Sequence, residues 1–301
     1  MTDTLEICPF CSSAEIRKTK KLPILFNGRT FLWRRCPSCG LLFLVPELTD
    51  KDYSILYSVS YHRKYYFRGD ESYSSRVNLL DRYGKKTILD YGCGDGGMLL
   101  AFAEKDYQAK GVEYDDSIVK VLRGKFPKIP VLTVPEFWNE SGEEKYDVIH
   151  LGDVLEHLNQ PLAVIRKLVA RLNPGGLIFI EGPLEANPNL SYYWRTGTMA
   201  ARRAIKREWA VVREPYHVFR SAYHNQLRFF ECCGLKTLYY KTLETGYPYI
   251  DRLEDVKSPW MFIQWAIART SIRISSWIPS WGNRFVYIGQ SVTGKESAPG
   301  P

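Results

Sequence analysis

The glycine-rich segment DYGCGDGG, residues 90–97, constrains the fold more than any other part of the sequence. It follows an apolar run at 87–89, as a loop follows a strand, and it leads into the apolar pattern of a helix at 96–106. Glycines in such a loop let the backbone approach a ligand closely and turn into a helix whose N-terminal amides face that ligand. The segment therefore predicts a nucleoside- or nucleotide-binding loop in an α/β fold.

Strand and helix patterns alternate beyond this loop. Further helices are expected at 116–126 and 156–172, a turn at 173–176, and strands at 109–115, 130–134, 145–152, 177–183, 235–243 and 283–291. Such βαβ alternation predicts a parallel sheet with helices on both faces. A chain of 301 residues is long enough for one large core of this kind and a small additional domain.

Two ligand patterns compete for the glycine loop, and the charge of Asp90 separates them. Gly92, Gly94 and Gly97 complete a dinucleotide fingerprint. Asp90, together with the first two of these glycines, completes the pattern for S-adenosylmethionine. A carboxylate here would repel a pyrophosphate, but it would attract the ammonium and sulfonium groups of S-adenosylmethionine. Glu113, at the end of the next strand, can accept hydrogen bonds from ribose hydroxyls in either case.

Four segments resemble, in order and spacing, the landmarks of class I S-adenosylmethionine-dependent methyltransferases. They are ILDYGCGDGG, GVEYD, YDVIHLGDVLEHL and LNPGGLIFIEGP, and they cover roughly residues 85–185. The resemblance implies a Rossmann-like, mostly parallel sheet of seven strands with the last strand antiparallel, and S-adenosylmethionine as the cofactor. The family often carries an acid after the third strand to hold the adenine, and one departure is that TVPEFWNE offers only Glu136 and backbone groups for this contact. The residues that the resemblance assigns to cofactor binding are Asp90, Tyr91, Gly92, Gly94, Glu113, Tyr114, Gly152 and Asp153.

Two CxxC pairs near the N-terminus contain Cys8, Cys11, Cys36 and Cys39. Each pair can turn two thiolates toward one ion, and Zn²⁺ accepts four thiolates in a tetrahedron that leaves no open position for chemistry. We therefore predict a structural zinc ribbon over 1–45, because so small a module has too little hydrophobic core to fold without a bound metal ion. The segment RCPSCGLLFLVPEL, followed by tyrosines, is similar to a methyltransferase subgroup with such a ribbon, found among bacterial surface-sugar and secondary-metabolite genes.

Candidate catalytic residues lie in DVLEHL and in EPYH. Asp153, Glu156 and His157 have the spacing i, i+3 and i+4, which places them on one face of a helix. His157 could be a general base, the triplet could hold a divalent cation like the acid-acid-His motif of quinone-pathway O-methyltransferases, or Glu156 and His157 could only orient the loop. His217 is a second candidate base, or a structural histidine; its segment is similar to the Pro-x-His segment ahead of the penultimate helix in the same subgroup.

The connector at 46–84 carries tyrosines at intervals of four. Tyr53, Tyr57, Tyr61 and Tyr65 would share one face of a helix. That helix either packs on the main domain or covers the cofactor as a lid.

Basic and apolar segments late in the chain suggest a partner. Six of the residues from Arg195 to Arg213 are basic. The insertion at 259–281 is rich in tryptophan and places Arg269 and Arg273 on one face. These segments could pack on the protein, rest on an anionic membrane or cap an acidic or phosphorylated substrate. The net charge of +8 permits all of these partners and also nucleic acid.

The expected location is the cytoplasm, with peripheral contact at the inner face of the membrane as an option. The N-terminal residues MTDTLEICPF do not form a signal sequence, and the chain contains no apolar run of about 18 uncharged residues. The expected organisation is a zinc ribbon (1–45), an aromatic connector or lid (46–84), a methyltransferase domain (85–293) with insertions around 187–220 and 255–282, and a disordered tail (294–301).

The favoured function is O-methylation of a small or sugar-like acceptor, including lipid- or nucleotide-linked forms. One alternative is an RNA methyltransferase that uses the zinc ribbon for RNA binding, since a ribbon also precedes the methyltransferase domain of an rRNA-modifying family. We favour it less because the chain lacks an Asn-Pro-Pro-Tyr motif. A second alternative is a binding protein that keeps the cofactor fold without catalysis. The sequence leaves the acceptor and the oligomeric state open.

Overall fold

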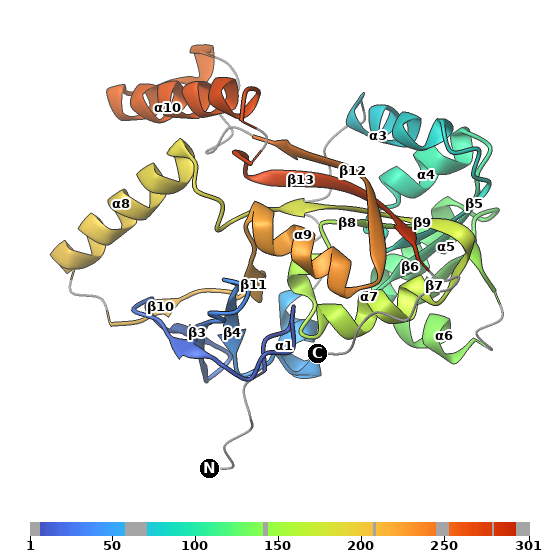
Figure 1. Ribbon diagram of the computed structural model, residues 1–301, viewed down its shortest axis with the longest axis horizontal. Helices are drawn as coiled ribbons and strands as arrows, with labels where there is room; N and C mark the ends of the chain where they lie inside the picture. The colour runs from blue at the N-terminus through green and yellow to red at the C-terminus, as the bar shows by residue number, and fades with distance from the viewer. Residues whose placement is uncertain are drawn as a thin grey trace.

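The computed structural model describes residues 7–57, 71–140, 144–206, 209–244, 253–278 and 280–292. Its main body is a seven-stranded sheet (Figure 1). The strands are β5 (Thr87–Tyr91), β6 (Gln108–Glu113), β7 (Val131–Thr133), β8 (Tyr146–Gly152), β9 (Leu172–Pro183), β12 (Leu235–Leu243) and β13 (Arg284–Ser291). They are arranged in the order β12-β13-β9-β8-β5-β6-β7, and only β13 runs antiparallel to its neighbours. The predicted Rossmann-like sheet is confirmed.

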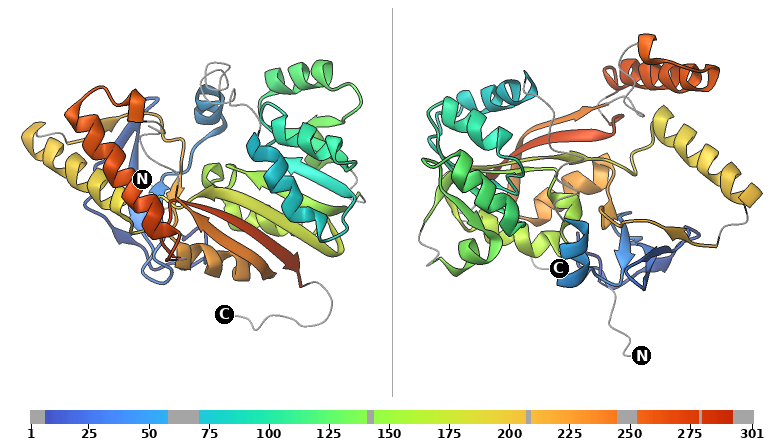
Figure 2. Two further views of the ribbon diagram at one scale, coloured as in Figure 1. Left: turned by 90° about the horizontal axis from the view of Figure 1, so that it is seen from above. Right: turned by 180° about the vertical axis from the view of Figure 1, so that it is seen from behind.

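Helices cover both faces of this sheet (Figure 2). Consecutive strand residues alternate between the faces, so Ile88 packs in the cluster beneath the helices α3 and α4 while Leu89 packs in the cluster beneath α7 and α9. Both side chains are fully buried, so a separate layer of helices covers each face of the sheet. The helices of the two layers and of the β6–β7 end are α3 (Glu71–Asp81), α4 (Gly97–Glu104), α5 (Asp116–Lys125), α6 (Val134–Asn139), α7 (Pro161–Val169) and α9 (Tyr223–Cys232).

The helix predicted at 156–172 is wrong in its first part. The chain forms a short 3₁₀ turn, η1 (Leu155–His157), and α7 begins only at Pro161. Proline lacks an N–H and has a fixed φ, which suits the first position of a helix and disfavours an interior one. The turn predicted at 173–176 falls inside β9, which begins at Leu172. Gly175 has φ of 71°, and the register of β9 against β8 shifts between Tyr146 and Val148, so the chain bends here within the strand.

The N-terminal residues form a second sheet, which we call the ribbon. Its own strands are β1 (Arg17–Lys18), β2 (Ile24–Phe26), β3 (Arg29–Arg35) and β4 (Leu42–Val45). Two short strands from the last third of the chain, β10 (Val211–Val212) and β11 (Phe219–Arg220), pair with β2 and β4. Phe10 contacts Phe229 of α9 with ring centroids 4.3 Å apart, so the ribbon and the main body share one core.

Three further helices lie outside the sheet layers: α1 (Asp50–Leu56), α8 (Leu190–Lys206) and α10 (Pro259–Ser275). α8 and α10 stand together at one side of the molecule (Figures 1 and 2). A short 3₁₀ turn, η2 (Leu253–Asp255), precedes α10. Among the described helices, none is long and apolar enough to cross a membrane. Tyr61, Tyr65 and the tail at 294–301 lie outside the described residues.

Candidate active site

The loop between β5 and α4 uses glycines in conformations that other residues rarely adopt. Gly92, Gly94 and Gly96 have φ values of 82°, 54° and 79°. A Cβ on Gly92 would lie 2.3 Å from Cγ2 of Val154, so the loop packs directly against the residues that follow β8. The ends of β5 and β8 therefore form one continuous wall of the site.

Asp90 is buried at the end of β5 and is held by a histidine. The Nδ1–H of His150, in β8, donates to Oδ1 of Asp90 over 2.7 Å. Within the described part of the chain, Oδ2 of Asp90 and Nε2 of His150 are buried and have no hydrogen-bond partner. A buried carboxylate oxygen without a partner is costly, so this position is suited to a ligand that brings a positive charge or a donor.

Glu113 lies beside the glycine loop at the end of β6. Its carboxylate accepts hydrogen bonds from the backbone N–H groups of Gly94 (2.8 Å) and Tyr114 (2.7 Å), so it fixes the loop against β6. Tyr114 is exposed beside it. Tyr91, the neighbour of Asp90, is buried on the opposite side of the strand, where its hydroxyl accepts from Nε1 of Trp138. Glu136 caps its own helix through Thr133.

Asp153 does not join Glu156 and His157, so the predicted metal triplet is not the one that the fold assembles. Asp153 has φ of 53°, in the left-handed region, which ends any helical spacing from this residue. Its carboxylate instead accepts from Arg284 of β13 at 2.7 and 2.8 Å. Gly152, the last residue of β8, directly precedes it and packs against the His150 ring.

Glu156, His157 and His217 come together at the end of β8, and their potential ligand atoms lie within 4.8 Å of one another. The Nδ1–H of His157 donates to the carbonyl of Tyr216 over 2.6 Å, and the Nδ1–H of His217 donates to Glu185 over 3.0 Å. The Nε2 atoms face Oε1 of Glu156 at 3.8 and 4.0 Å, too far for hydrogen bonds. Both rings therefore present Nε2 to the same space.

Electrostatics separate the members of this cluster. Burial, and then the charge of Asp153, raises the pKa of Glu156 to about 8. Burial, and then the nearby His217, lowers the pKa of His157 to about 4. Burial also lowers the pKa of His217, but the Glu185 carboxylate more than reverses this, and the net shift is upward. His217 is thus the more basic histidine, and its side chain is 33% exposed against 13% for His157.

Tyrosines from α1 cover this part of the site. The Tyr53 hydroxyl donates to the His157 carbonyl over 2.7 Å, and the Tyr57 ring meets the His157 ring edge-on at 5.6 Å. Both rings also contact Tyr114, at 5.8 and 6.1 Å. We call Tyr53, Tyr57 and Tyr114 the tyrosine shelf. It connects the end of β6, beside Glu113, with the histidines.

The four predicted metal ligands of the ribbon converge. Cys8 Sγ lies 3.5 Å from Cys39 Sγ, and Cys11 Sγ lies 3.6 Å from Cys36 Sγ. All four sulfurs lie within 4.8 Å of one another. Thiolates around a tetrahedral zinc ion, with Zn–S bonds of about 2.3 Å, have this kind of spacing.

The strands β5, β6 and β8, with the glycine loop and the acid at the end of β6, lie in a segment that matches a known protein family. The profile described as "Methyltransferase domain" matches residues 63–227, which is more than half of the chain. The chain belongs to this family. The predicted class I methyltransferase family is confirmed, and S-adenosylmethionine is the cofactor that goes with this family and fold.

Named relatives agree with this assignment. The chain is 30% identical over 129 residues to the "Ubiquinone biosynthesis O-methyltransferase" of Idiomarina loihiensis, covering 41% of this chain and 51% of that protein. It is 28% identical over 163 residues to the protein of the same name from Nitrosomonas europaea, covering 49% and 68%. The chain thus spans about half the length of the first of these relatives. A solved "SAM dependent methyltransferase" from Archaeoglobus fulgidus shares the fold, with a TM-score of 0.50, 18% identity and coverage of 78% of this chain and all of that one.

Sequence reasoning missed three residues of the site. His150 lies inside the apolar pattern of β8. A histidine at such a position was a signal that a polar group enters the core. Glu185 and Arg284 gave no local signal, because Glu185 follows β9 and Arg284 opens β13, far from DVLEHL in the sequence. Only the sheet order brings β13 next to β9, and β9 in turn lies beside β8.

Proposed function

We propose that this chain is an S-adenosylmethionine-dependent O-methyltransferase for a small or sugar-like acceptor, including lipid- or nucleotide-linked forms. The observation that carries the proposal is the Glu185–His217 pair, in which Glu185 accepts from Nδ1–H of His217 and leaves Nε2, which faces Glu156, able to accept a proton. A carboxylate that holds a histidine in one tautomer is a recurrent arrangement for a general base. The O-methyltransferase names of the relatives support the same chemistry.

The predicted cofactor residues fit S-adenosylmethionine. The partnerless, buried Oδ2 of Asp90 is suited to the positive end of the cofactor, and Glu113 stands where the ribose hydroxyls would lie. Bound S-adenosylmethionine supplies a methyl group that its sulfonium activates for displacement. His150 holds Asp90 in place, and the left-handed glycines let the backbone approach the ligand.

In this proposal His217 takes the proton of the acceptor hydroxyl, and Glu185 stabilises the imidazolium that results. His157 is a neutral imidazole near pH 7 because of its low pKa, and it offers a hydrogen-bond acceptor at Nε2. Glu156, with its raised pKa, carries a proton near neutral pH and offers a donor. Glu156 would therefore donate to the oxygen of the acceptor hydroxyl, and His217 would take its one proton, while Nε2 of His157 is left for another donor of the acceptor.

The test is a methyl-transfer screen over sugar nucleotides, phenols and RNA, followed by His217→Ala on the best acceptor. Loss of a general base lowers turnover by about 10²- to 10⁴-fold. His224→Ala is the matched control, because His224 is exposed on α9. Calorimetry should give the same S-adenosylmethionine affinity for all three proteins. Full turnover in the His217→Ala variant would refute the base, and absence of cofactor binding in the parent would refute the function.

The alternatives give different outcomes in the same screen. A divalent cation held by Glu156, His157 and His217 predicts turnover that depends on added Mg²⁺ or Mn²⁺. An RNA methyltransferase predicts salt-dependent RNA binding. The O-methyltransferase proposed here predicts neither dependence. For the ribbon we propose one structural Zn²⁺ held by Cys8, Cys11, Cys36 and Cys39, which metal analysis of the purified protein can count.

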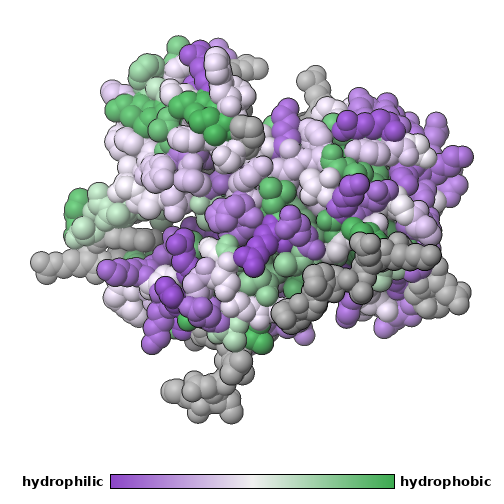
Figure 3. All heavy atoms as spheres, viewed as in Figure 1, coloured by the Kyte–Doolittle hydropathy of each residue, from purple (hydrophilic) through white to green (hydrophobic). Residues whose placement is uncertain are grey.

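We also propose that α10 rests on an anionic membrane surface. Figure 3 shows apolar side chains gathered over α10, and Trp260, Phe262 and Trp277 are 51%, 49% and 86% exposed. The sequence from 256 to 292 contains basic residues, including Arg269 and Arg273 of this helix, and no Asp or Glu. Tryptophans at both ends of a helix together with an acid-free basic segment are typical of peripheral helices.

Vesicle sedimentation tests this location. The protein should sediment with vesicles that contain phosphatidylglycerol. It should stay in the supernatant with pure phosphatidylcholine vesicles or at high salt. The double variant Trp260→Ser, Trp277→Ser should lose most of the binding. Trp209→Ser is the control, since Trp209 is also exposed, at 73%, but precedes β10 rather than α10. Equal retention of the double variant and the control would refute the proposed surface.

A further inference from the structure

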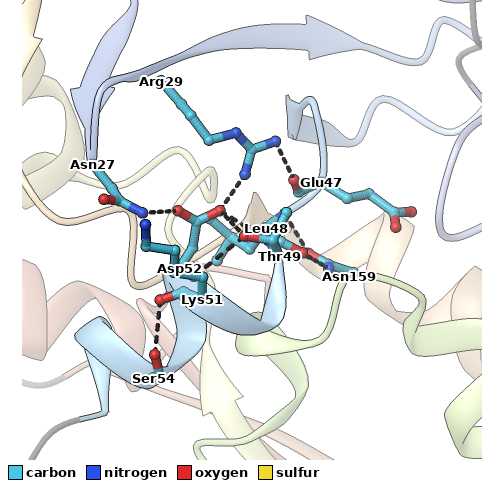
Figure 4. A network of polar contacts seen from close by, with 9 residues as sticks. All are labelled: Asn27, Arg29, Glu47, Leu48, Thr49, Lys51, Asp52, Ser54 and Asn159. Atoms are coloured by element: carbon cyan, nitrogen blue, oxygen red, sulfur yellow. Dashed lines mark hydrogen bonds and ion pairs between the residues drawn. The ribbon is translucent and has the colours of Figure 1, made fainter.

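Asp52 is a fully buried carboxylate between the ribbon and α1 (Figure 4). Its Oδ1 accepts from the Asn27 amide over 2.8 Å, and its Oδ2 accepts from Arg29. The Thr49 N–H and hydroxyl donate to Oδ2 over 2.9 and 2.8 Å, which closes the capping box of α1. Burial alone would raise the pKa of Asp52, but these donors and Arg29 lower it to about 2, so the group is ionised at all working pH values.

The two ribbon donors come from one tight turn. Asn27 and Gly28, between β2 and β3, have φ values of 49° and 69°, as a two-residue hairpin requires. This turn holds Asn27 and Arg29 on the side that faces α1 (Figure 4). Arg29 also donates to the carbonyl of Glu47 over 3.0 Å. The ribbon hairpin therefore forms hydrogen bonds with the start of α1 at more than one point.

The other side of α1 is attached to the segment that carries the histidines. The Asn159 side chain donates to the Leu48 carbonyl over 2.8 Å and accepts from the Leu48 N–H over 3.2 Å. One turn further along, the Tyr53 hydroxyl donates to the His157 carbonyl over 2.7 Å. The helix thus forms a bridge from the ribbon hairpin to the residues just after β8.

We propose that Asp52 is a positioning residue for the acceptor, because it fixes α1 to the ribbon and thereby holds the tyrosine shelf over His157. The shelf presents aromatic faces between Tyr114 and the histidines, and such faces bind the flat or C–H-rich face of a ring. The acceptor is accordingly a ring-bearing molecule that packs on Tyr53 and Tyr57. The acceptor assignment rests on the proposed function, whereas the attachment of α1 through Asp52 does not.

We call the contacts of Asp52 with Asn27, Arg29 and Thr49 the clamp, and they give the ribbon a structural role in this chain. α1 has only seven residues, and so short a helix is unstable by itself in water. Its capping acid is shared with Asn27 and Arg29, so the helix is complete only when the ribbon hairpin is folded against it. In this proposal the ribbon acts as a scaffold for the tyrosine shelf.

The test compares Asp52→Asn with Asp50→Asn. Asp50 is an exposed acid in the first turn of the same helix, so its variant removes the same charge without touching the clamp. Loss of a hydrogen bond to a charged group corresponds to about tenfold or more in an equilibrium. We expect Asp52→Asn to speed hydrogen exchange about tenfold in 49–57 and 155–159, with little change in β3 or β5, and Asp50→Asn to leave both segments unchanged.

Kinetics supply the second readout. Asp52→Asn should raise the acceptor KM about tenfold while the calorimetric Kd for S-adenosylmethionine stays within about twofold, because the clamp touches no residue of the glycine-loop wall. A merely structural role would lower both affinities or neither. Unchanged KM with accelerated exchange would overturn the acceptor assignment alone, and unchanged exchange would overturn the clamp itself.

A milder variant protects the test against misfolding. Asn27→Gly keeps the left-handed backbone of the turn and removes only the amide that donates to Asp52. It should change exchange and KM in the same direction as Asp52→Asn but by a smaller factor. If Asp52→Asn fails to fold and Asn27→Gly behaves like the parent protein in both measurements, the proposal is wrong.

Discussion

The segment from Asp90 to Gly97 gathers its functional groups from eight consecutive residues, whereas the Glu156–His157–His217 cluster draws on segments 60 residues apart in the chain. The first side of the site is made mainly of backbone in left-handed conformations and one buried acid. The second side is made of side chains whose roles are set by neighbours such as Glu185 and Asp153. The difference indicates that substitutions which change side-chain shape should affect the cofactor side most. Substitutions that change a charge or the position of a proton should affect the acceptor side most.

The largest expected effect of this difference is at Gly92. A Cβ there would overlap Val154, and a left-handed φ costs a residue with a Cβ about 1–2 kcal/mol, to which the overlap adds about 1–3 kcal/mol. Gly92→Ala should therefore lower the free energy of unfolding by about 3 kcal/mol and abolish cofactor binding. Urea unfolding and calorimetry measure the two effects.

Gly124→Ala is the matched control for Gly92→Ala. A Cβ on Gly124, in α5, would meet nothing within 4 Å, and alanine is favoured over glycine in a helix by about 0.5–1 kcal/mol. This variant should be slightly more stable than the parent and should bind the cofactor normally. If Gly92→Ala were equally harmless, the loop would not depend on shape.

An intermediate effect is expected for Asp90→Asn, which keeps the shape of the side chain and removes its charge. A hydrogen bond to a charged group contributes about 1.5–3 kcal/mol, so the affinity for S-adenosylmethionine should fall about tenfold to a hundredfold. Asp116→Asn, an exposed acid at the start of α5, serves as the control and should bind normally. Equal affinities in the two variants would show that the charge of Asp90 does not recognise the cofactor.

A smaller effect, confined to the acceptor side, is expected for Glu185→Gln. The carboxylate raises the pKa of His217, so its removal lowers that pKa and weakens the base. Turnover should fall about tenfold, and the acidic limb of the pH profile of kcat/KM should move to lower pH, because His217 then loses its proton at a lower pH. Cofactor affinity should not change. A limb that stays in place would mean that another group titrates there.

The sequence predicted the elements that depend on local patterns. The strands at 235–243 and 284–291, the glycine loop and the convergence of the four cysteines all follow from residue spacing over short distances. The helix through Glu156 and His157 was not predicted correctly, because the preference of Pro161 for a helix start outweighed the apolar pattern on which the prediction was based. An error of one turn there was enough to assign Asp153 to the wrong partners.

The sequence by itself determined that this chain builds a methyltransferase sheet with a glycine loop at the end of β5 and a cysteine-rich ribbon in front of it. The tertiary structure alone decided that Arg284 pairs with Asp153 and that Glu185 pairs with His217. It also decided that Asp52 attaches α1 to the ribbon hairpin. The physical reason is the range of the interactions. Glycine conformation and thiolate spacing are set within a few residues, whereas the partner of a buried charge is set by the strands and turns that the fold brings next to it.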